Sequence, residues 1–354
     1  MSVIRWVLGL CVMLWVAVAG AADKPVSVVF INPGYSNEPF WVDYSRFMHE
    51  AAEQLGMQFE VIYGERDVPR MLQVARQLSH SATPPDYLIF TNEQFAGPQI
   101  LRLFEGRRTR LLALHSTLNP EQRALTGGSR ERYSNWIGSL VPNDEEAGYL
   151  MGRALIEQAG GRPAQMLAFT GVKQTPSATL RLDGLHRALA EAPNVRLEQA
   201  LYGEWQQRRA YEQARALLPR YPRLDLIWSA NDEMAFGVMQ AAQELGRKLH
   251  YSALNNSQRV LQAHADGRID ILASGHFLLG GCALVMLYDH AHGADFASRG
   301  GKDQIAQLLR LISGDQARNL AKHLKRAQAD VDFTRFSAVL NPGGSVCSVD
   351  ALLE

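Results

Sequence analysis

The stretch Ser27-Val-Val-Phe-Ile-Asn-Pro-Gly-Tyr-Ser-Asn-Glu-Pro-Phe-Trp41 decides how the rest of the chain is interpreted. Its apolar beginning predicts a buried β-strand over Val26–Asn32, and its polar and aromatic continuation predicts a loop at the carboxyl end of that strand. An amphipathic pattern then predicts a helix over Trp41–Leu55, which Gly56 ends. A strand, a loop rich in functional groups and a helix, in this order, are typical of an α/β domain.

The residues before this stretch have the pattern of a secretory signal peptide. Arg5 supplies a positive charge, Trp6–Val18 is apolar and uncharged, and Ala17–Ala22 offers small residues for several cleavage points. The apolar run is shorter than the roughly 20 residues of a membrane-spanning helix, although a retained anchor is the alternative. We therefore predict that residues 1–22 are removed and that the mature protein lies in the periplasm without spanning the membrane.

The composition limits the class of protein. The 36 Lys and Arg residues balance the 36 Asp and Glu residues, so no basic surface for a nucleic-acid partner is expected. The chain without its leader is longer than one typical hydrophobic core requires, and two lobes are expected. Cys282 and Cys347 would be the only cysteines left. They could form a disulfide in an oxidising compartment or remain two small buried side chains.

The order of strand, loop and helix recurs along the chain. Apolar runs predict further strands, for example over Phe59–Tyr63, Ala164–Thr170 and Leu224–Ala230, with helical patterns between them. This alternation predicts mostly parallel sheets with helices on both faces. The C-terminal part has a weaker pattern, in which Ile305–Ser313 is predicted to be helical. The two halves share the order of their elements but no evident repeat of sequence.

Polar and aromatic residues follow many of the predicted strands. Ligands of open α/β sheets bind at the carboxyl ends of the strands, so these residues are the candidate ligand-binding side chains. They are Ser36, Asn37, Glu38, Phe40, Trp41, Asn92, His115 and Asn143 in the first half, and Arg181, Asn231, Asp232 and Asn255 in the second. Aromatic rings beside amides and carboxylates suit a polyhydroxylated ligand, because rings cover its apolar face and polar groups pair with its hydroxyls.

Several of these candidates also have a structural interpretation. The loop around Asn37 could be only the start of a helix, His115 a structural residue, and Arg181 part of a surface salt bridge. Asn143 could be an N-cap followed by acids in the first helical turn. For Asn231 and Asp232, capping a helix and binding a ligand are compatible roles.

Four motifs follow one another across nearly the whole mature chain. They are Asn37-Glu-Pro-Phe-Trp41, Asn143-Asp144 with Gly148, Arg181-Leu-Asp-Gly184, and Asn231-Asp-Glu-Met-Ala-Phe-Gly237. Together they resemble the type I periplasmic binding proteins, the ribose- and galactose-binding superfamily that also supplies the core of LacI-type repressors. The resemblance implies an α/β fold of two doubly wound parallel-sheet lobes joined by a three-segment hinge.

The same resemblance implies where the lobes begin and end. The N-terminal lobe is expected to comprise residues 23–140 plus 275–330, and the C-terminal lobe residues 141–274 plus 331–354. The chain would then cross between the lobes near Leu140, Ser274 and Asp330.

Within the superfamily, Pro33-Gly34 with Trp41-Val42 and Pro85-Asp86-Tyr-Leu-Ile-Phe-Thr91 resemble the autoinducer-2-binding quorum-sensing receptors. By this resemblance, Gly275 or His276 falls where a second arginine is expected, and His276 joins the candidate site. Trp41, Arg181 and Asp232 keep the expected residue type, whereas Ser36, Glu38, His115 and Asn231 differ and Leu254 replaces an aromatic residue. Because a borate diester relies on paired cations, a ligand other than autoinducer-2 is expected.

The resemblance implies a periplasmic protein that closes on a small polar, sugar-like ligand and presents it to an ABC importer. The alternative is a periplasmic sensor subunit that signals occupancy to a membrane histidine kinase or cyclase. No hydrolase, metalloprotease or P-loop motif indicates an enzyme, and the leader stands where a regulator would carry its helix-turn-helix. No cofactor is expected. We interpret Asp289-His290-Ala-His292-Gly-Ala-Asp295 as a polar helix end rather than a metal site.

Overall fold

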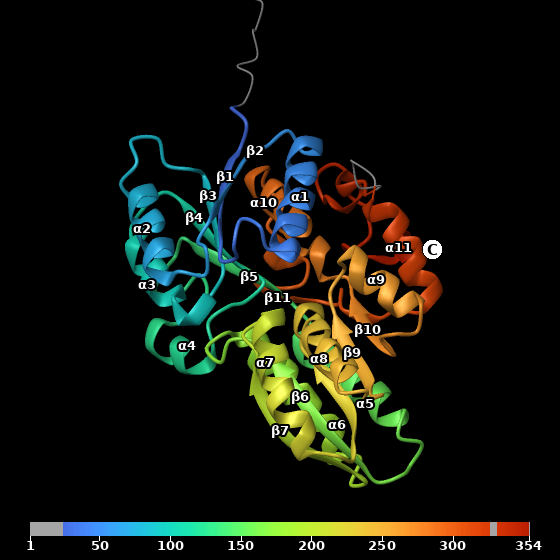
Figure 1. Ribbon diagram of the computed structural model, residues 1–354. Coiled ribbons are helices and arrows are strands. Elements are labelled where there is room, and N and C mark those ends of the chain that lie inside the picture. The colour runs from blue at the N-terminus through green and yellow to red at the C-terminus, as the bar shows by residue number, and fades with distance from the viewer. Residues whose placement is uncertain (1–23, 326–330, 354) are drawn as a thin grey trace, which may run out of the picture.

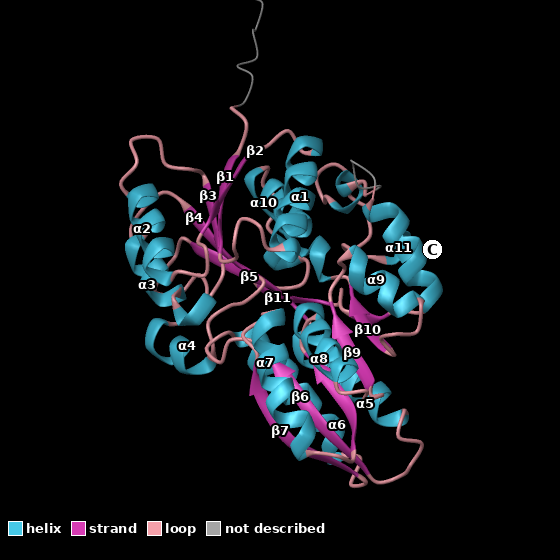
Figure 2. Ribbon diagram, viewed as in Figure 1, coloured by secondary structure: helices cyan, strands magenta, loops and turns pink. Residues whose placement is uncertain are grey.

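The computed structural model describes residues 24–325 and 331–353 and shows two α/β lobes (Figure 1). The predicted signal peptide, residues 1–22, lies outside the described residues. Each lobe contains a six-stranded sheet with helices packed around it (Figure 2). The predicted fold class, two doubly wound parallel-sheet lobes, is confirmed.

The first sheet has the strand order β11-β5-β4-β3-β1-β2, and all of its pairs are parallel. Its strands are β1 (Ser27–Asn32), β2 (Gln58–Tyr63), β3 (Tyr87–Phe90), β4 (Arg110–Leu114), β5 (Trp136–Pro142) and β11 (Asp303–Ala306). The helices of this lobe are α1 (Pro39–Gln54), α2 (Val68–Ser79), α3 (Gly97–Leu103), α4 (Pro120–Thr126) and α10 (Leu279–Ala291).

Strand β1 shows why its sequence is apolar without interruption. Val28 and Phe30 pack in one core cluster with α1, whereas Val29 and Ile31 pack on the other face with α2 and α3. A strand buried on both faces needs apolar residues at every position. This packing fixes the carboxyl end of β1, at Asn32, in the space between the lobes.

The second sheet has the strand order β12-β10-β9-β8-β6-β7, and only its edge pair β10–β12 is antiparallel among the described strands. Its strands are β6 (Ala164–Thr170), β7 (Val195–Tyr202), β8 (Leu224–Ser229), β9 (His250–Leu254), β10 (Ile271–Ser274) and β12 (Arg310–Leu311). Its helices are α5 (Asp144–Glu157), α6 (Pro176–Ala190), α7 (Gln207–Leu217), α8 (Asp232–Glu244), α9 (Gln258–Ala265), α11 (Gly314–Leu324) and α12 (Asp350–Leu353).

Helices α5 and α6 pack backbone against backbone at two glycines. A Cβ atom on Gly148 would lie 2.0 Å from the carbonyl oxygen of Arg181, and one on Gly184 would lie 2.0 Å from that of Glu145. No residue with a side chain fits these positions without separating the helices. The two motif glycines therefore set the distance at which α6 presents Arg181 to Asp144.

The predicted helix over Ile305–Ser313 is wrong. This stretch forms β11, which pairs with β5 in the first sheet, and β12, which pairs with β10 in the second. Its apolar residues are spaced as on a helix, but pairing with two distant strands overrides that local pattern. Helices α4 and α11 were not predicted.

The third passage between the lobes differs from the expected one. The chain leaves the first sheet at β11 and enters the second at β12, so it crosses within residues 307–309. The expected crossing point, Asp330, lies outside the described residues. Helix α11, expected in the first lobe, packs against α9 of the second.

The C-terminal segment contacts both lobes. Phe333 packs against α10 where a Cβ on Gly281 would lie 2.2 Å from its ring, and its N–H donates to Gln54 of α1. Cys347 then forms a disulfide with Cys282 of α10, with the two Cα atoms 6.0 Å apart. Cys282 and Cys347 are therefore paired, whereas the sequence left open whether they form a disulfide or remain two separate buried side chains.

Beyond the disulfide the chain returns to the second lobe. Val349 is buried beside Gly275, Asp350 forms an ion pair with Arg310 of β12, and α12 packs against α11. The expectation that residues 331–354 lie wholly in the second lobe is therefore wrong. We propose instead a first lobe of residues 24–142, 276–306 and 331–347, and a second lobe of 143–275, 307–325 and 348–353.

Candidate ligand-binding site

A cavity lies between the lobes at the carboxyl ends of the strands; we call it the inner cavity. Its lining residues from the second lobe are Thr175, Ser177, Arg181, Trp205, Asn231 and Asn255. Those from the first lobe are Pro33, Glu38, Phe40, Trp41, Arg66, Thr91, Glu93, His115, Ser116 and, next to the hinge, His276.

Most of the predicted site residues lie in or beside this cavity. Those that line it are Glu38, Phe40, Trp41, His115, Arg181, Asn231, Asn255 and His276. Asp232 lines an adjoining cavity, the side cavity, and Asn37 lies in the outer mouth of the cleft. Their roles in ligand binding stay predictions.

Two predicted site residues have side chains that are hydrogen-bonded to backbone, and a third lies outside the cavities. The side chain of Asn92 accepts from the N–H of Gly97 and donates to the carbonyl of Thr117, each at 2.9 Å. Asn143 pairs in both directions with the backbone of Leu309, also at 2.9 Å, and so ties together two passages of the hinge. Ser36 is exposed outside these cavities.

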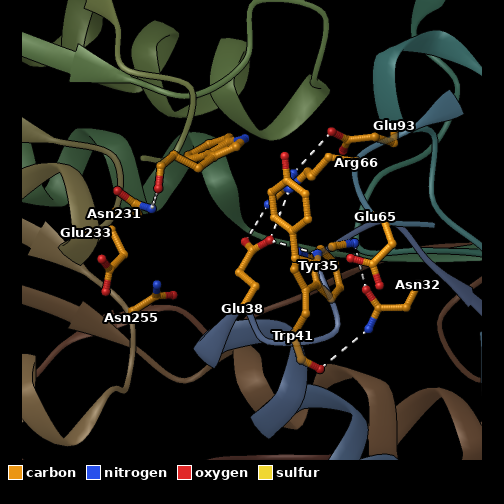
Figure 3. Close-up of polar contacts among 12 residues, drawn as sticks. Asn32, Tyr35, Glu38, Trp41, Glu65, Arg66, Glu93, Asn231, Glu233 and Asn255 are labelled. Atoms are coloured by element: carbon orange, nitrogen blue, oxygen red, sulfur yellow. Dashed lines mark hydrogen bonds and ion pairs between the residues drawn. The ribbon is translucent and has the colours of Figure 1, made fainter. Parts of the chain in front are cut away.

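Arg66 is the main cation on the first-lobe side of the inner cavity. Figure 3 shows its guanidinium between two carboxylates: Nε donates to Glu38 at 3.1 Å and Nη1 to Glu93 at 3.2 Å. Burial raises the pKa of Glu93 above its usual range, although the charge of Arg66 opposes that shift. The three side chains form a buried charged group already satisfied by its own members.

Arg181 is the corresponding cation from the second lobe. Its Nε donates to Asp144 at 2.7 Å and its Nη1 to the carbonyl of Ala230 at 2.8 Å, and the residue is 3% exposed. This is a buried ion pair, not the surface salt bridge that the sequence left as an alternative. Burial raises the pKa of Asp144, while Arg181 lowers it. The guanidinium carbon also lies 5.6 Å from the ring centre of Trp205.

Two histidines complete an aromatic wall. The rings of Phe40 and His276 stack with their centres 4.6 Å apart. The ring centre of His115 lies 5.1 Å from that of Trp41 and 5.7 Å from that of His276. Burial lowers the pKa of His115 to about 3, with the charges of Arg181 and Arg66 adding to the shift. Burial also lowers the pKa of His276 well below its usual range. Both imidazoles are therefore neutral near pH 7.

Several buried polar atoms on this wall have no hydrogen-bond partner. They include Nδ1 of His115, Nδ1 of His276, Nε1 of Trp41 and Oγ1 of Thr91, all on residues at most 8% exposed. Buried polar groups in folded proteins are normally paired, and a set of unpaired ones around one cavity fits a ligand that pairs with them. An imidazole, an indole and a hydroxyl offer donors and acceptors for hydroxyl groups.

Arg66 and Trp205 are site residues that the sequence analysis missed. They hold matching positions in Tyr63-Gly-Glu-Arg66 and Tyr202-Gly-Glu-Trp205, which follow β2 and β7. The last two residues of both loops are left-handed, with φ of 55° and 56° in the first and 53° and 66° in the second. The repeated Tyr-Gly-Glu is the signal that could have found them, contrary to the expectation that the halves share no sequence repeat.

The match between these loops extends to an arginine in the following helix. Arg70 donates from Nε to the carbonyl of Tyr63, and Arg209 donates from Nε to the carbonyl of Tyr202, each at 3.0 Å. Left-handed non-glycine residues carry backbone strain that the surrounding structure must hold, and they concentrate at functional sites. Each lobe thus holds one strained loop in the same way and directs a side chain into the cleft.

The cluster near His290 holds its residues by contacts within the protein. His290 pairs with the hydroxyl of Tyr87 at 2.8 Å, Asp289 accepts from the backbone N–H of Ala338, and Asp295 forms an ion pair with Arg130. Over residues 24–325 and 331–353, no group of three or more His, Cys, Asp or Glu side chains is placed to hold a metal ion.

Two hinged lobes around a polar and aromatic cavity define a ligand-binding protein, and comparisons with known proteins agree. The crystal structure of a periplasmic sugar-binding protein from Pseudomonas fluorescens is 46% identical, with a TM-score of 0.84, and the match covers 93% of this chain and 100% of that one. A family model described as a periplasmic binding protein domain matches residues 138–295. The chain therefore belongs to the periplasmic binding proteins, in their type I form, as its motifs indicated.

More distant relatives match over parts of their length. The D-allose-binding periplasmic protein of Escherichia coli K12 is 23% identical over 214 residues, which are 60% of this chain and 66% of that protein. The transcriptional repressor PurR of Pectobacterium carotovorum is 30% identical over 120 residues, 34% of each chain. These relatives are named as binding proteins or repressors, in agreement with the expectation that the chain is not an enzyme. The narrower resemblance to autoinducer-2 receptors stays a prediction.

Proposed function

We propose that this chain is a periplasmic solute-binding protein that closes on a small sugar-like ligand and presents it to an ABC importer. The observation that carries this proposal is the set of buried, unpaired polar atoms beside the rings of Phe40, Trp41 and His276. A sugar ring has hydroxyl groups that pair with such atoms and apolar faces that such rings cover. The names of the Pseudomonas and Escherichia relatives support the same ligand class.

Closure of the lobes would connect binding to transport. The inner cavity is lined from both lobes, so the ligand has its full set of contacts only when the lobes are together. A membrane partner that binds the joint surface of the closed form would respond to occupancy. None of the helices in the described ranges has the length and apolar character needed to cross a membrane itself.

A thermal-shift screen of the mature protein against pentoses, hexoses and polyols tests this proposal. A ligand at 100 times its dissociation constant should stabilise the protein by about 2.7 kcal/mol. His276→Leu should remove that shift, because leucine fills the space beside Phe40 but offers no hydrogen-bonding nitrogen. The matched control is His49→Leu, at an exposed position of α1 outside the cleft. The absence of any shift across the whole panel would count against a sugar ligand.

The membrane partner is tested separately. Deletion of the gene should abolish uptake of the sugar identified in the screen, and re-expression should restore it. Normal uptake together with a lost transcriptional response to the same sugar would instead favour the sensor alternative.

A further inference from the structure

The cleft carries more negative than positive charge. The inner and side cavities share the residues Glu38, Phe40, Trp205, Asn231 and Asn255, so they form one continuous space between the lobes. Five carboxylates and two guanidiniums line this space: Glu38, Asp43, Glu93, Asp232 and Glu233, with Arg66 and Arg181. The two histidines are neutral, so they do not alter this balance.

Both guanidiniums are already paired. Arg66 donates to two carboxylates, and Arg181 donates to Asp144 and to a backbone carbonyl. Two side-cavity acids also have cations nearby: Asp43 lies 3.6 Å from Arg46, and Arg259 acts electrostatically on Glu233. Arg66 offers one positive charge to two carboxylates, so that group keeps a net negative charge, and Asp232 is the carboxylate lining these cavities that has no cation beside it.

Asp232 is buried without a cation. The residue is 1% exposed and accepts from Nδ2 of Asn255 at 2.7 Å, from Oγ of Ser257 at 2.5 Å and from the N–H of Glu233 at 3.0 Å. None of these donors carries a positive charge, and no ion pair joins Asp232 to another residue of the described ranges. Burial raises the pKa of Asp232 above its usual range, although these hydrogen bonds oppose that shift. They and the N-terminus of α8 stabilise the carboxylate in part, and a ligand cation would stabilise it further.

The rest of the side cavity also suits a cation. The rings of Phe40 and Trp205 line both cavities, and aromatic faces attract positive charge. Figure 3 shows Asn231, Glu233 and Asn255 on the second-lobe side of the cleft and Glu38 on the first-lobe side. A ligand ring in the inner cavity, held by its unpaired polar atoms, can extend a substituent past the two asparagines toward Asp232.

We propose that the ligand is an amino sugar or a similar polyhydroxylated amine, with its ring in the inner cavity and its ammonium group in the side cavity against Asp232. This inference rests on the proposed function and specifies the ligand class of the same site. Uronic acids and sugar phosphates are disfavoured, since their negative charge would meet the surplus carboxylates.

Calorimetric titration of the mature protein with matched sugars tests this inference. The probes are D-glucosamine, D-galactosamine and D-mannosamine, each compared with its parent hexose and with D-glucuronate, together with the amine of any sugar found in the screen. We expect one amine to bind roughly 10- to 100-fold more tightly than its parent, the difference that a charge-assisted hydrogen bond supplies. No binding of glucuronate is expected.

Two substitutions make the test specific to the charge. Asp232→Asn should bring the ratio of amine to parent affinity toward one, and Asp266→Asn, at an exposed position of the same lobe, should leave that ratio unchanged. If Asp232→Asn does not fold, Glu233→Gln provides the second measurement and should lower the same ratio.

The outcomes separate the two proposals. Parent hexoses that bind as tightly as their amines would overturn the amine inference and leave the sugar-binding function standing. A panel in which neither hexoses, pentoses, polyols nor amines bind would overturn the proposed function, and the inference with it.

Discussion

His115 and His276 are held neutral in the inner cavity, and the energetic cost of this state depends on pH. A histidine in an unfolded chain has a pKa of about 6.5. In the folded protein burial lowers the pKa of His115 to about 3, and it lowers that of His276 well below its usual range. Below about pH 6.5 the unfolded chain therefore binds protons that the folded protein does not.

We expect the protein to lose stability as the pH falls from about 6.5 toward 3. No stability is lost to these histidines above that window, and for His115 the loss reaches about 1.4 kcal/mol at pH 5.5. The loss from His276 has the same sign and adds to it. The raised pKa values of Glu93 and Asp144 act in the opposite direction, because these folded carboxyls bind protons more readily than unfolded ones. That effect begins near the usual carboxyl pKa of about 4 and extends above it, so the histidine effect is measured by comparing each histidine variant with the wild type, which has the same carboxyls.

The measurement is the melting temperature of four proteins between about pH 7.5 and 5.5. The wild type should lose more stability over this range than His115→Gln or His276→Gln. The exposed control His49→Gln should follow the wild type. Equal pH dependence in all of these proteins would contradict the burial argument.

From the sequence, a site residue could be predicted only where it follows the carboxyl end of a predicted strand. Glu38, His115 and Asn231 follow strands and do line the inner cavity. Asn92 and Asn143 follow strands as well, but an amide pairs with backbone as readily as with a ligand, and the sequence does not show which way it points. Local pattern therefore identifies the neighbourhood of a site more reliably than its individual contacts.

At the scale of elements, the contact between α5 and α6 positions the buried ion pair. The backbone of each helix lies where a side chain on Gly148 or Gly184 would have to go. The close approach places Nε of Arg181, on α6, 2.7 Å from Oδ1 of Asp144, at the start of α5. The geometry of the second-lobe side of the site thus depends on two residues that have no functional group.

We expect Gly184→Ala to weaken both stability and ligand binding. The added methyl group would lie 2.0 Å from the carbonyl oxygen of Glu145, so the helices must separate. Overpacking of this kind costs about 1–3 kcal/mol, which a denaturant titration measures directly. The control is Gly343→Ala, where a Cβ atom has no neighbour within 4 Å. A Gly184→Ala protein as stable as the control would show that the helix pair can adjust.

Long elements were predictable and short edge strands were not. Strand β6 lies at its predicted bounds, and helix α1 begins two residues before and ends one residue before its predicted bounds, because apolar periodicity and the stop at Gly56 fix them locally. Strands β11 and β12 have four and two residues, and only their pairing with distant strands defines them. The start of α11 did carry a local signal, the capping box formed by Ser313 and Gln316.

At the scale of the whole molecule, the C-terminal segment joins the lobes behind the hinge. Phe333 packs on the first lobe, the disulfide fixes Cys347 to α10, and Val349 and Leu352 are buried in the second lobe. Only Ser348 separates the disulfide from Val349. The topology of this segment could not be read from the sequence, because a pair of cysteines does not show whether its members meet.

We expect loss of the disulfide to destabilise the protein strongly. The disulfide joins residues with a sequence separation of 65. By lowering the conformational entropy of the unfolded chain, a loop of this length stabilises the folded protein by about 4 kcal/mol. The measurement is the urea midpoint of the wild type with and without a reducing agent. Reduction should lower that midpoint in the wild type and leave the double variant Cys282→Ala/Cys347→Ala, which starts lower, unchanged. A wild type indifferent to reduction would argue against a stabilising role for the link.

The paired loops ending at Arg66 and Trp205 have a consequence for how such a protein diversifies. The two loops have backbones held by matching hydrogen bonds but carry different side chains at the last position, a guanidinium in one lobe and an indole in the other. Substitution at either position can change recognition while the scaffold stays as it is. After gene duplication, single substitutions at these two positions can therefore change the ligand specificity of a receptor. A protein engineer who wants a biosensor for a new analyte can begin with the same two positions.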